Sequence, residues 1–139
     1  MDLAALHELA RKGADYSYSP YSHFRVGAAL LCDDGTVFLG TNVENRSFGL
    51  TICAERSAIV AAASAGKRSF TALAISTPDS ASPVGPCGAC RQVISEFMEP
   101  DAPVRFGGSD GSLVDATVGS LVPFDSLHEL ASRLGEADR

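Results

Sequence analysis

Three cysteines at the starts of two expected helices constrain this chain more than any other feature. Cys53 opens one apolar stretch, and Cys87 and Cys90 open another. Cys87 and Cys90 are three residues apart, so both sulfurs can project from one helical turn while Cys53 approaches from the neighbouring helix. Three thiolates with no evident fourth protein ligand are typical of a zinc site that keeps one coordination position for water. The pattern predicts a hydrolytic zinc site between two helices.

The residues next to these cysteines predict how protons and charge are handled. Glu55, two residues after Cys53, is expected to carry protons to a ring nitrogen and a leaving amine rather than to bind the metal. A Glu near one ligand and a Pro-Cys-x-x-Cys segment is the pattern of zinc deaminases. Arg56 and Gln92 are candidates for hydrogen bonds to the sulfurs, which would offset the net negative charge of a three-thiolate site. A surface ion pair is the alternative for Arg56.

The cysteines also fit two other arrangements, a structural zinc centre with a fourth ligand and a pair of disulfides. Cys32 or one of three histidines, His7, His23 and His128, could close the site as a structural zinc centre. The histidines have no spacing that groups them, and Cys32 is expected to be a buried strand residue. Two disulfides are disfavoured because Cys-x-x-Cys spacing in a reducing compartment is typical of metal binding.

The length and charge of the chain limit the kind of partner it can have. With 139 residues, it is expected to form a single domain over residues 1–139. A net charge of -6 provides no basic stripe for nucleic acid, so a small-molecule substrate is favoured. The chain starts with an amphipathic pattern and has no membrane-length apolar run, which predicts a cytoplasmic protein without membrane contact.

Apolar periodicity predicts strands that alternate with helices. Helices are expected over residues 3–13, capped by Asp2 and ended by Gly13, over 53–65 with Gly66 as a C-cap, and over 87–97 and about 126–135. Strands are expected over residues 26–32, 37–39, 70–75, 104–106 and 113–116. This order predicts an α/β fold, a three-layer α/β/α sandwich around one mixed central sheet.

Four segments, read in order, resemble the motifs of cytidine deaminases of the small homotetrameric class. They are residues 21–29, 42–45, 49–58 and 86–93, and the resemblance runs from about residue 18 to 123. It implies hydrolysis of cytidine or deoxycytidine to the uracil nucleoside and ammonia, in pyrimidine salvage. It also implies one zinc ion per subunit, held by Cys53, Cys87 and Cys90, with Glu55 as the proton shuttle.

The resemblance further implies how the nucleoside is held. Phe24 would pack on the pyrimidine, Asn42 and Glu44 would bind the 3′-hydroxyl of the ribose, and the backbone at Ala54 would read the base edge. Read without the family, Phe24 is a core aromatic residue and Asn42 a turn residue.

Three positions depart from the family pattern. Arg46 and Phe48 stand where similar enzymes commonly have a small residue and Tyr, in a segment expected to reach a neighbouring subunit. Near the C-terminus, Phe124 directly follows Pro123 instead of standing further on, so an aromatic lid would be displaced or absent. Two alternatives therefore stay open: a deaminase of a modified or 5′-charged nucleoside or of a nucleobase, and a non-catalytic zinc-stabilised module.

Overall fold

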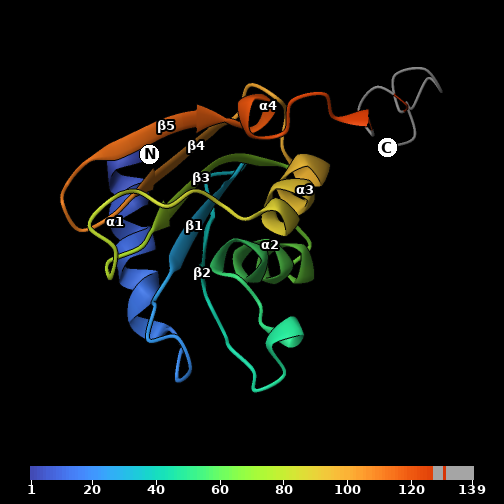
Figure 1. Ribbon diagram of the computed structural model, residues 1–139. Helices are drawn as coiled ribbons and strands as arrows, with labels where there is room; N and C mark the ends of the chain where they lie inside the picture. The colour runs from blue at the N-terminus through green and yellow to red at the C-terminus, as the bar shows by residue number, and fades with distance from the viewer. Residues whose placement is uncertain (127–129, 131–139) are drawn as a thin grey trace.

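The computed structural model describes residues 1–126 and 130, and these residues build one mixed sheet (Figure 1). The strands are β1 (Gly27–Cys32), β2 (Val37–Thr41), β3 (Phe70–Ser76), β4 (Pro103–Gly107) and β5 (Leu113–Thr117). The helices are α1 (Leu3–Gly13), α2 (Ala54–Ser64), α3 (Gly88–Phe97) and α4 (Val118–Leu121), with short 3-10 helices η1 (Ala14–Tyr16) and η2 (Phe48–Leu50).

The sheet has five strands in the order β2-β1-β3-β4-β5. Strand β1 pairs antiparallel with β2 and β3, β3 pairs parallel with β4, and β5 closes the other edge antiparallel to β4. The parallel pair needs a crossover connection, and α3 lies in that connection. The predicted mixed sheet is confirmed.

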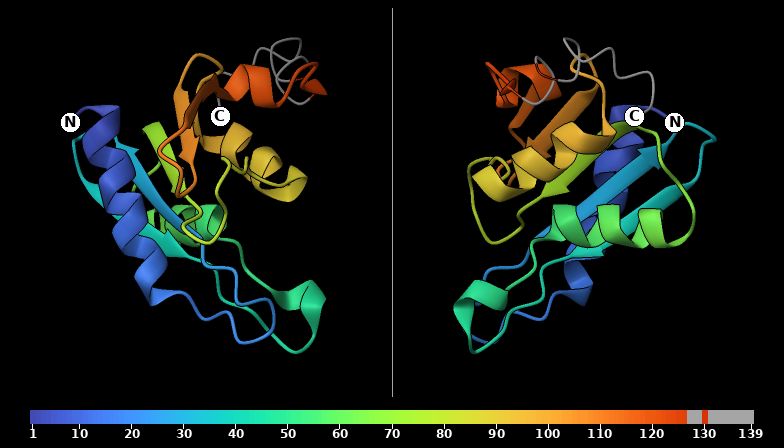
Figure 2. Two further views of the ribbon diagram at one scale, coloured as in Figure 1. Left: turned by 60° about the vertical axis from the view of Figure 1, so that its left-hand side comes forward. Right: turned by 90° about the vertical axis from the view of Figure 1, so that its right-hand side faces the viewer.

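Helices cover both faces of the sheet, with α1 on one side and α2 and α3 on the other (Figure 2). Alternating residues of β3 divide between the two layers: Ala72 and Ala74 pack under α1, whereas Leu73 and Ile75 belong to the larger core. That core also contains Ile59 of α2. The three-layer α/β/α prediction is therefore confirmed.

Both ends of α1 lie where the sequence predicted them. Asp2 caps the helix as expected, since its Oδ1 accepts a hydrogen bond from the Ala5 N–H at 2.8 Å. Gly13 ends α1 but is not a left-handed cap, because its φ is -58° and the chain continues into η1. A Cβ on Gly13 would lie 3.0 Å from the Gly40 carbonyl oxygen, so glycine here allows α1 to approach the sheet closely.

Helices α2 and α3 begin where the cysteine pattern predicted. Cys53 and Cys87 occupy the N-cap positions, and neither side chain makes a capping hydrogen bond. The predicted cap at Gly66 is confirmed: this glycine has a φ of +89°, its N–H donates to Ala63 O, and Lys67 N donates to Ala62 O. These two bonds form the Schellman arrangement.

Differences from the prediction lie mainly at short elements. Strand β2 extends to Thr41, and η2 and α4 were not anticipated. A reciprocal capping box between Thr117 and Ser120 starts α4. The helix expected over residues 126–135 lies, apart from Ser126 and Leu130, outside the described residues. Within the described part of the chain, no helix combines the length and the apolar character needed to cross a bilayer.

Candidate active site

A cavity of about 180 Å³ lies where α2, α3 and the end of β3 meet. Residues that could do chemistry or bind a ligand line it, namely Phe24, Asn42, Thr51, Cys53, Glu55, Thr77 and Cys87, together with the apolar side chains of Val26, Ile75 and Val84. A larger hollow of about 490 Å³ opens beside α1 and is lined by His7, Arg11 and Arg25 among others. Its lining contains no cysteine, and Arg11 and Arg25 pair with Asp15 and Asp79. The chemistry therefore points to the smaller cavity.

The sulfur atoms of Cys53, Cys87 and Cys90 all lie within 4.8 Å of one another. The Sγ atoms of Cys53 and Cys87 are 3.9 Å apart. Two thiolates on a tetrahedral zinc with Zn–S bonds of about 2.3 Å would be about 3.8 Å apart, so this spacing fits the metal. Among the described residues, no other Cys, His, Asp or Glu joins the group.

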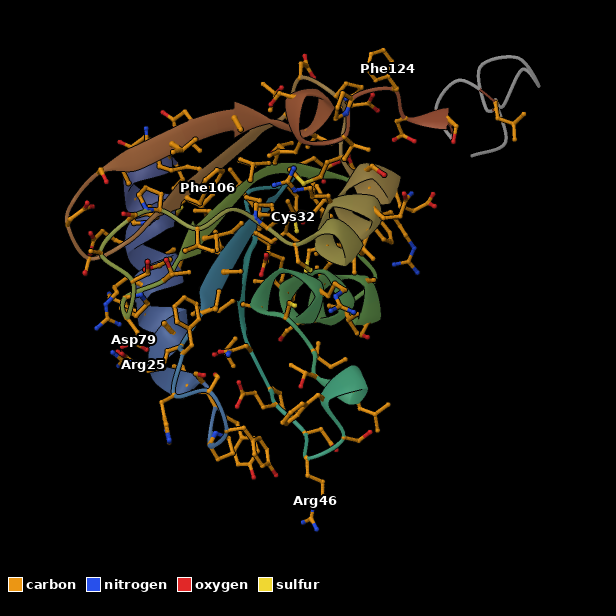
Figure 3. The ribbon with its side chains drawn as sticks, viewed as in Figure 1. Arg25, Cys32, Arg46, Asp79, Phe106 and Phe124 are labelled. Carbon is orange, nitrogen blue, oxygen red and sulfur yellow. The ribbon has the colours of Figure 1, made fainter. Side chains whose placement is uncertain are left out.

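The side chains considered as a fourth ligand lie elsewhere or outside the described part. Cys32 is buried on β1 in the larger core (Figure 3). His7 lies on α1, across the sheet, and the exposed His23 lies in the loop before β1 with a positive φ of 57°. His128 is outside the described residues. Cys87 is exposed, so the three-sulfur cluster opens toward solvent on one side.

The charges around the sulfurs are coupled. Hydrogen bonding from Cys90, helped by Arg56, lowers the pKa of Cys53 to about 5. The same interaction with Cys53, together with burial, raises the pKa of Cys90. Arg56 Nη2 donates to Cys53 Sγ at 3.3 Å, and its contacts with the two thiols raise the pKa of the guanidinium. Arg56 thus places a positive charge directly beside the sulfurs.

The contact expected from Gln92 is absent from the described structure. Gln92 is exposed on α3, two residues beyond the buried Cys90. Two residues correspond to about 200° around a helix, so the two side chains leave α3 on opposite sides. Of the two residues predicted to hydrogen-bond the sulfurs, Arg56 therefore does so and Gln92 does not.

Glu55 stands in the first turn of α2 and is only 4% exposed. Burial raises the pKa of its carboxyl to about 7, and the nearby Cys53 thiolate acts in the same direction. The carboxyl lines the cavity together with Cys53 and Cys87 but does not belong to the sulfur cluster. The fold thus places a group with an adaptable protonation state beside a metal-binding cluster.

The predicted nucleoside contacts lie in two environments. Phe24 and Asn42 line the cavity. Asn42 is buried and joins the loop before β1 to β2: its Oδ1 accepts from Ser17 Oγ at 2.5 Å and Val26 N at 2.9 Å, and its Nδ2 donates to Phe24 O at 2.8 Å. Asn42 therefore fixes the position of the Phe24 backbone.

Glu44 and Ala54 lie beside the cavity rather than in its lining. The Glu44 carboxylate accepts from Tyr21 N at 3.0 Å and Ser22 N at 3.2 Å, and also from the Ser22 hydroxyl, which lowers the pKa of Glu44. Ala54 is the first residue of α2, where backbone N–H groups have no acceptor within the helix.

The residues that depart from the family pattern are exposed and do not line the cavity of their own chain. Arg46 stands at the tip of the loop between β2 and η2 and points into solvent (Figure 3). Phe48 is 74% exposed and meets Tyr21 edge-on, with ring centroids 5.9 Å apart. Phe124 is fully exposed and has a φ of 58°. In one chain, none of the three lines the cavity.

Several residues of the cavity region were not identified from the sequence. Thr51, Thr77 and Val84 line the cavity, and Asp79 binds Arg25 through three hydrogen bonds of 2.8 to 3.0 Å (Figure 3). Arg25 lies between the lining residues Phe24 and Val26, so this ion pair joins two loops of the cavity. No local pattern signals these long-range pairings.

Comparison with known proteins gives a consistent result. Residues 2–104 match a family model described as the cytidine and deoxycytidylate deaminase zinc-binding region. The chain is 47% identical over 123 residues to a cytidine deaminase of Sporosarcina psychrophila, covering 88% of this chain and 90% of the relative. It is 46% identical over 123 residues to one of Halalkalibacterium halodurans, covering 88% and 92%. A crystal structure of cytidine deaminase from Burkholderia pseudomallei superimposes with a TM-score of 0.85 at 44% identity, covering 89% of this chain and 98% of that one.

Proposed function

Since the chain belongs to the cytidine and deoxycytidylate deaminase family, we propose that it hydrolyses cytidine or deoxycytidine to the uracil nucleoside and ammonia. The observation that carries the proposal is the presence of Glu55, Cys53 and Cys87 in one cavity of about 180 Å³. A pyrimidine whose amine pointed toward these three residues would contact a proton carrier and the sulfur cluster together.

Cys53, Cys87 and Cys90 would hold one zinc ion per subunit, and the 3.9 Å separation of two of the sulfurs supports that assignment. When bound, zinc supplies Lewis-acid activation of water at neutral pH. Arg56 offsets the charge of the three thiolates through its hydrogen bond to Cys53.

Glu55 would perform the proton transfers. It accepts a proton from the attacking water, gives it to the ring nitrogen beside the amine, and then helps the amine leave as ammonia. Water and cytidine are consumed and uridine and ammonia are formed, so the atoms balance. The burial of Glu55 supports this role because a carboxyl with a pKa near the working pH can both accept and donate protons.

The rest of the site would orient the nucleoside. Phe24 lies in the cavity wall, where its ring can pack on the base. Asn42 and Glu44 would bind the ribose, and the free N–H groups at Ala54 would hydrogen-bond the base edge. Arg46 and Phe48 would act across a subunit boundary, because both are exposed and neither lines the cavity of its own chain.

The surrounding biology is proposed on related grounds. We place the enzyme in the cytoplasm, in pyrimidine salvage, because thiolate ligands persist in a reducing compartment. Residues 1–139 would act as one deaminase domain. A homotetramer is supported by exposed apolar side chains on the loop after β2, among them Phe48, Leu50 and Ile52.

The test is release of ammonia from the zinc-loaded enzyme across cytidine, deoxycytidine, cytidine 5′-monophosphate and cytosine. Cytidine or deoxycytidine should be preferred, and activity should fall on metal removal and return with zinc. Preference for the monophosphate would favour a 5′-charged substrate, read by Arg46. Zinc binding without any ammonia release would favour a non-catalytic zinc-stabilised module.

A further inference from the structure

The chain that leads into Cys87 is held by an arginine side chain. Pro86 O accepts a hydrogen bond from Arg91 Nε at 2.8 Å. Within the described part of the chain, residues 83–86 make no other hydrogen bond. Pro86 is buried and Arg91 is half-buried, so water competes little for this contact. The position of the segment before α3 therefore depends on Arg91.

Arg91 bonds both of the peptide planes that flank Cys87. Its side chain holds the Pro86–Cys87 peptide, and its backbone N–H donates to Cys87 O at 2.9 Å, which holds the Cys87–Gly88 peptide. The φ and ψ of Cys87, -68° and 168°, are the two rotations between these planes. Fixing both planes fixes the direction of the Cα–Cβ bond. Arg91 thus restricts where the Sγ atom of Cys87 can lie.

The start of α2 meets the same need with backbone atoms alone. Ile52 O, the carbonyl before Cys53, accepts a hydrogen bond from the Val43 N–H at 2.9 Å. In the described structure no strand pairs with the segment before α3, so no backbone N–H is supplied there. The side chain of Arg91 does for Cys87 what the pairing with Val43 does for Cys53.

The same guanidinium lies against the cavity wall and the end of α4. A Cβ placed on Gly85 would lie 3.5 Å from Arg91 Nη2, and Gly85 lines the cavity together with Val84. Arg91 Nη1 donates to Leu121 O at 3.3 Å, at the last residue of α4. The rigid fork of a guanidinium suits two carbonyl groups at once. Arg91 therefore joins α4 to the segment that carries both the wall and the thiol.

We propose that Arg91 is a positioning residue that holds Cys87 and the adjoining cavity wall in the arrangement that retains zinc and binds the nucleoside. The inference rests on the proposed function, in which Cys87 is a zinc ligand. Arg91 does not line the cavity, so it would act through Pro86 and Gly85 and not on the substrate. In this it differs from Arg56, which donates directly to a thiol.

The central experiment compares Arg91→Met, which removes every donor of the side chain, with Arg91→Lys, which keeps a cation able to bond one carbonyl. Zinc release from the loaded enzyme is followed with a chromogenic chelator, and KM and kcat for cytidine are measured with zinc in excess. Arg91→Met should release zinc about ten- to hundredfold faster, because its loss frees a metal ligand. Its KM should rise about three- to tenfold, since the cavity wall loses its anchor. Its kcat should stay near wild type, and Arg91→Lys should lie between the two.

Arg68→Met is the matched control. Arg68 Nη1 also donates to two backbone carbonyls, Ala63 O and Lys67 O, each at 2.8 Å, at the end of α2 remote from Cys53. Its replacement removes the same kind of contact without touching the cavity. Arg68→Met should therefore match wild type in zinc release and KM, whatever the change in its melting temperature. Equal acceleration of zinc release in both variants would show that Arg91 acts on stability alone.

A spectroscopic measurement reads the arrangement of the thiolates without turnover. Cobalt(II) is loaded in place of zinc, and its visible absorption bands report the geometry of the ligands around it. Arg91→Met should shift these bands, whereas Arg68→Met should reproduce the wild-type spectrum. A wild-type spectrum and wild-type zinc release in Arg91→Met would overturn the proposal.

The two proposals fail in different ways. If wild type deaminates cytidine and Arg91→Met matches it in zinc release, cobalt spectrum and KM, only the role of Arg91 is refuted. If wild type binds zinc but releases no ammonia from cytidine, the proposed function is refuted. The zinc-release and cobalt measurements then still decide whether Arg91 positions Cys87.

Discussion

Arg56 donates a hydrogen bond from Nη2 to Cys53 Sγ at 3.3 Å, within the first turn of α2. The contact puts a permanent cation next to a thiolate that three-sulfur metal binding would leave with excess negative charge. We therefore expect Arg56→Gln to weaken zinc binding about ten- to hundredfold, as measured by competition with a chromogenic chelator. Arg11→Gln, which changes the same residue type on α1, should bind zinc normally. Equal zinc affinity in Arg56→Gln and wild type would refute the role of Arg56.

Glu55→Gln should separate proton transfer from metal binding. The amide keeps the shape of the buried side chain but cannot accept a proton, so kcat for cytidine should fall about a hundred- to ten-thousandfold. Zinc content and melting temperature should stay near wild type. Glu96→Gln, on an exposed position of α3, is the control and should retain full activity. Activity of Glu55→Gln within tenfold of wild type would argue against its role as proton carrier.

Cys87→Ala should lose metal and stability together. Cys53 and Cys87 start two different helices, so a metal bound between them joins α2 to α3. We expect the zinc content of purified Cys87→Ala to fall sharply, and its melting temperature to drop and no longer respond to a chelator. Cys32→Ala should keep its zinc, since this buried thiol lies on β1 outside the cluster. Loss of zinc in Cys32→Ala together with normal zinc content in Cys87→Ala would show that the metal binds elsewhere.

The Arg25–Asp79 pair should contribute to the free energy of unfolding, and this contribution should disappear at acid pH. Hydrogen bonding from the Arg25 side chain lowers the pKa of Asp79 to about 2, below the value of about 3.9 in an unfolded chain. The stabilisation by the ion pair is present in full above the pKa of Asp79 in the unfolded chain. It is lost as the pH falls through the lower pKa of Asp79 in the folded protein. The unfolding free energy of wild type should therefore exceed that of Asp79→Asn by a constant amount above about pH 5, and the gap should close between about pH 4 and 2.

Denaturant unfolding at a series of pH values measures this gap. Arg25→Gln should also lose stability at neutral pH, because it removes both side-chain hydrogen bonds, but by less, since its backbone N–H still donates to Asp79 Oδ2. A gap between wild type and Asp79→Asn that persists unchanged at pH 2 would show that Asp79 stabilises the loop by some means other than its charge.

Assembly should depend on the loop that carries Phe48. Phe48 is 74% exposed and lies close in sequence to the exposed Leu50, which is typical of a surface buried by a partner. Sedimentation should therefore find a homotetramer for wild type and smaller species for Phe48→Asp. Lys12→Asp, on an exposed position of α1, should leave the assembly intact. A wild-type protein that is fully active as a monomer would contradict the predicted assembly.

The sequence predicted the fold well wherever the signal was local. Nearly continuous apolar runs located β1 and β3, and Gly66 marked the end of α2 because its turn requires a positive φ. Gly13 ends α1 as predicted, but its small size serves a contact that the sequence does not signal, with Gly40 of β2, 27 residues further along the chain. Only the folded chain shows which glycines serve turns and which serve close packing.

The same distinction holds for the site. The cysteine spacing identified three residues that the fold gathers into one cluster, because helix starts position their side chains predictably. Gln92 was expected beside the sulfurs from its nearness in sequence, yet its angular position on α3 turns it to solvent. Thr77 was missed because its proximity to Glu55 arises from the pairing of strands and loops, which has no periodic signature.

The cavity is built partly from the starts of two helices and partly from loops, and these two parts can change separately in evolution. The three cysteines and Glu55 belong to the starts of α2 and α3, whereas Phe24 and Val84 stand on connecting segments that pack against them. Loop residues tolerate substitution and length change far better than residues inside a packed helix pair. Drift in these loops can therefore retune which nucleoside is accepted while the hydrolytic machinery is inherited intact. Directed evolution toward new substrates should accordingly concentrate its libraries on residues 22–26 and 77–85.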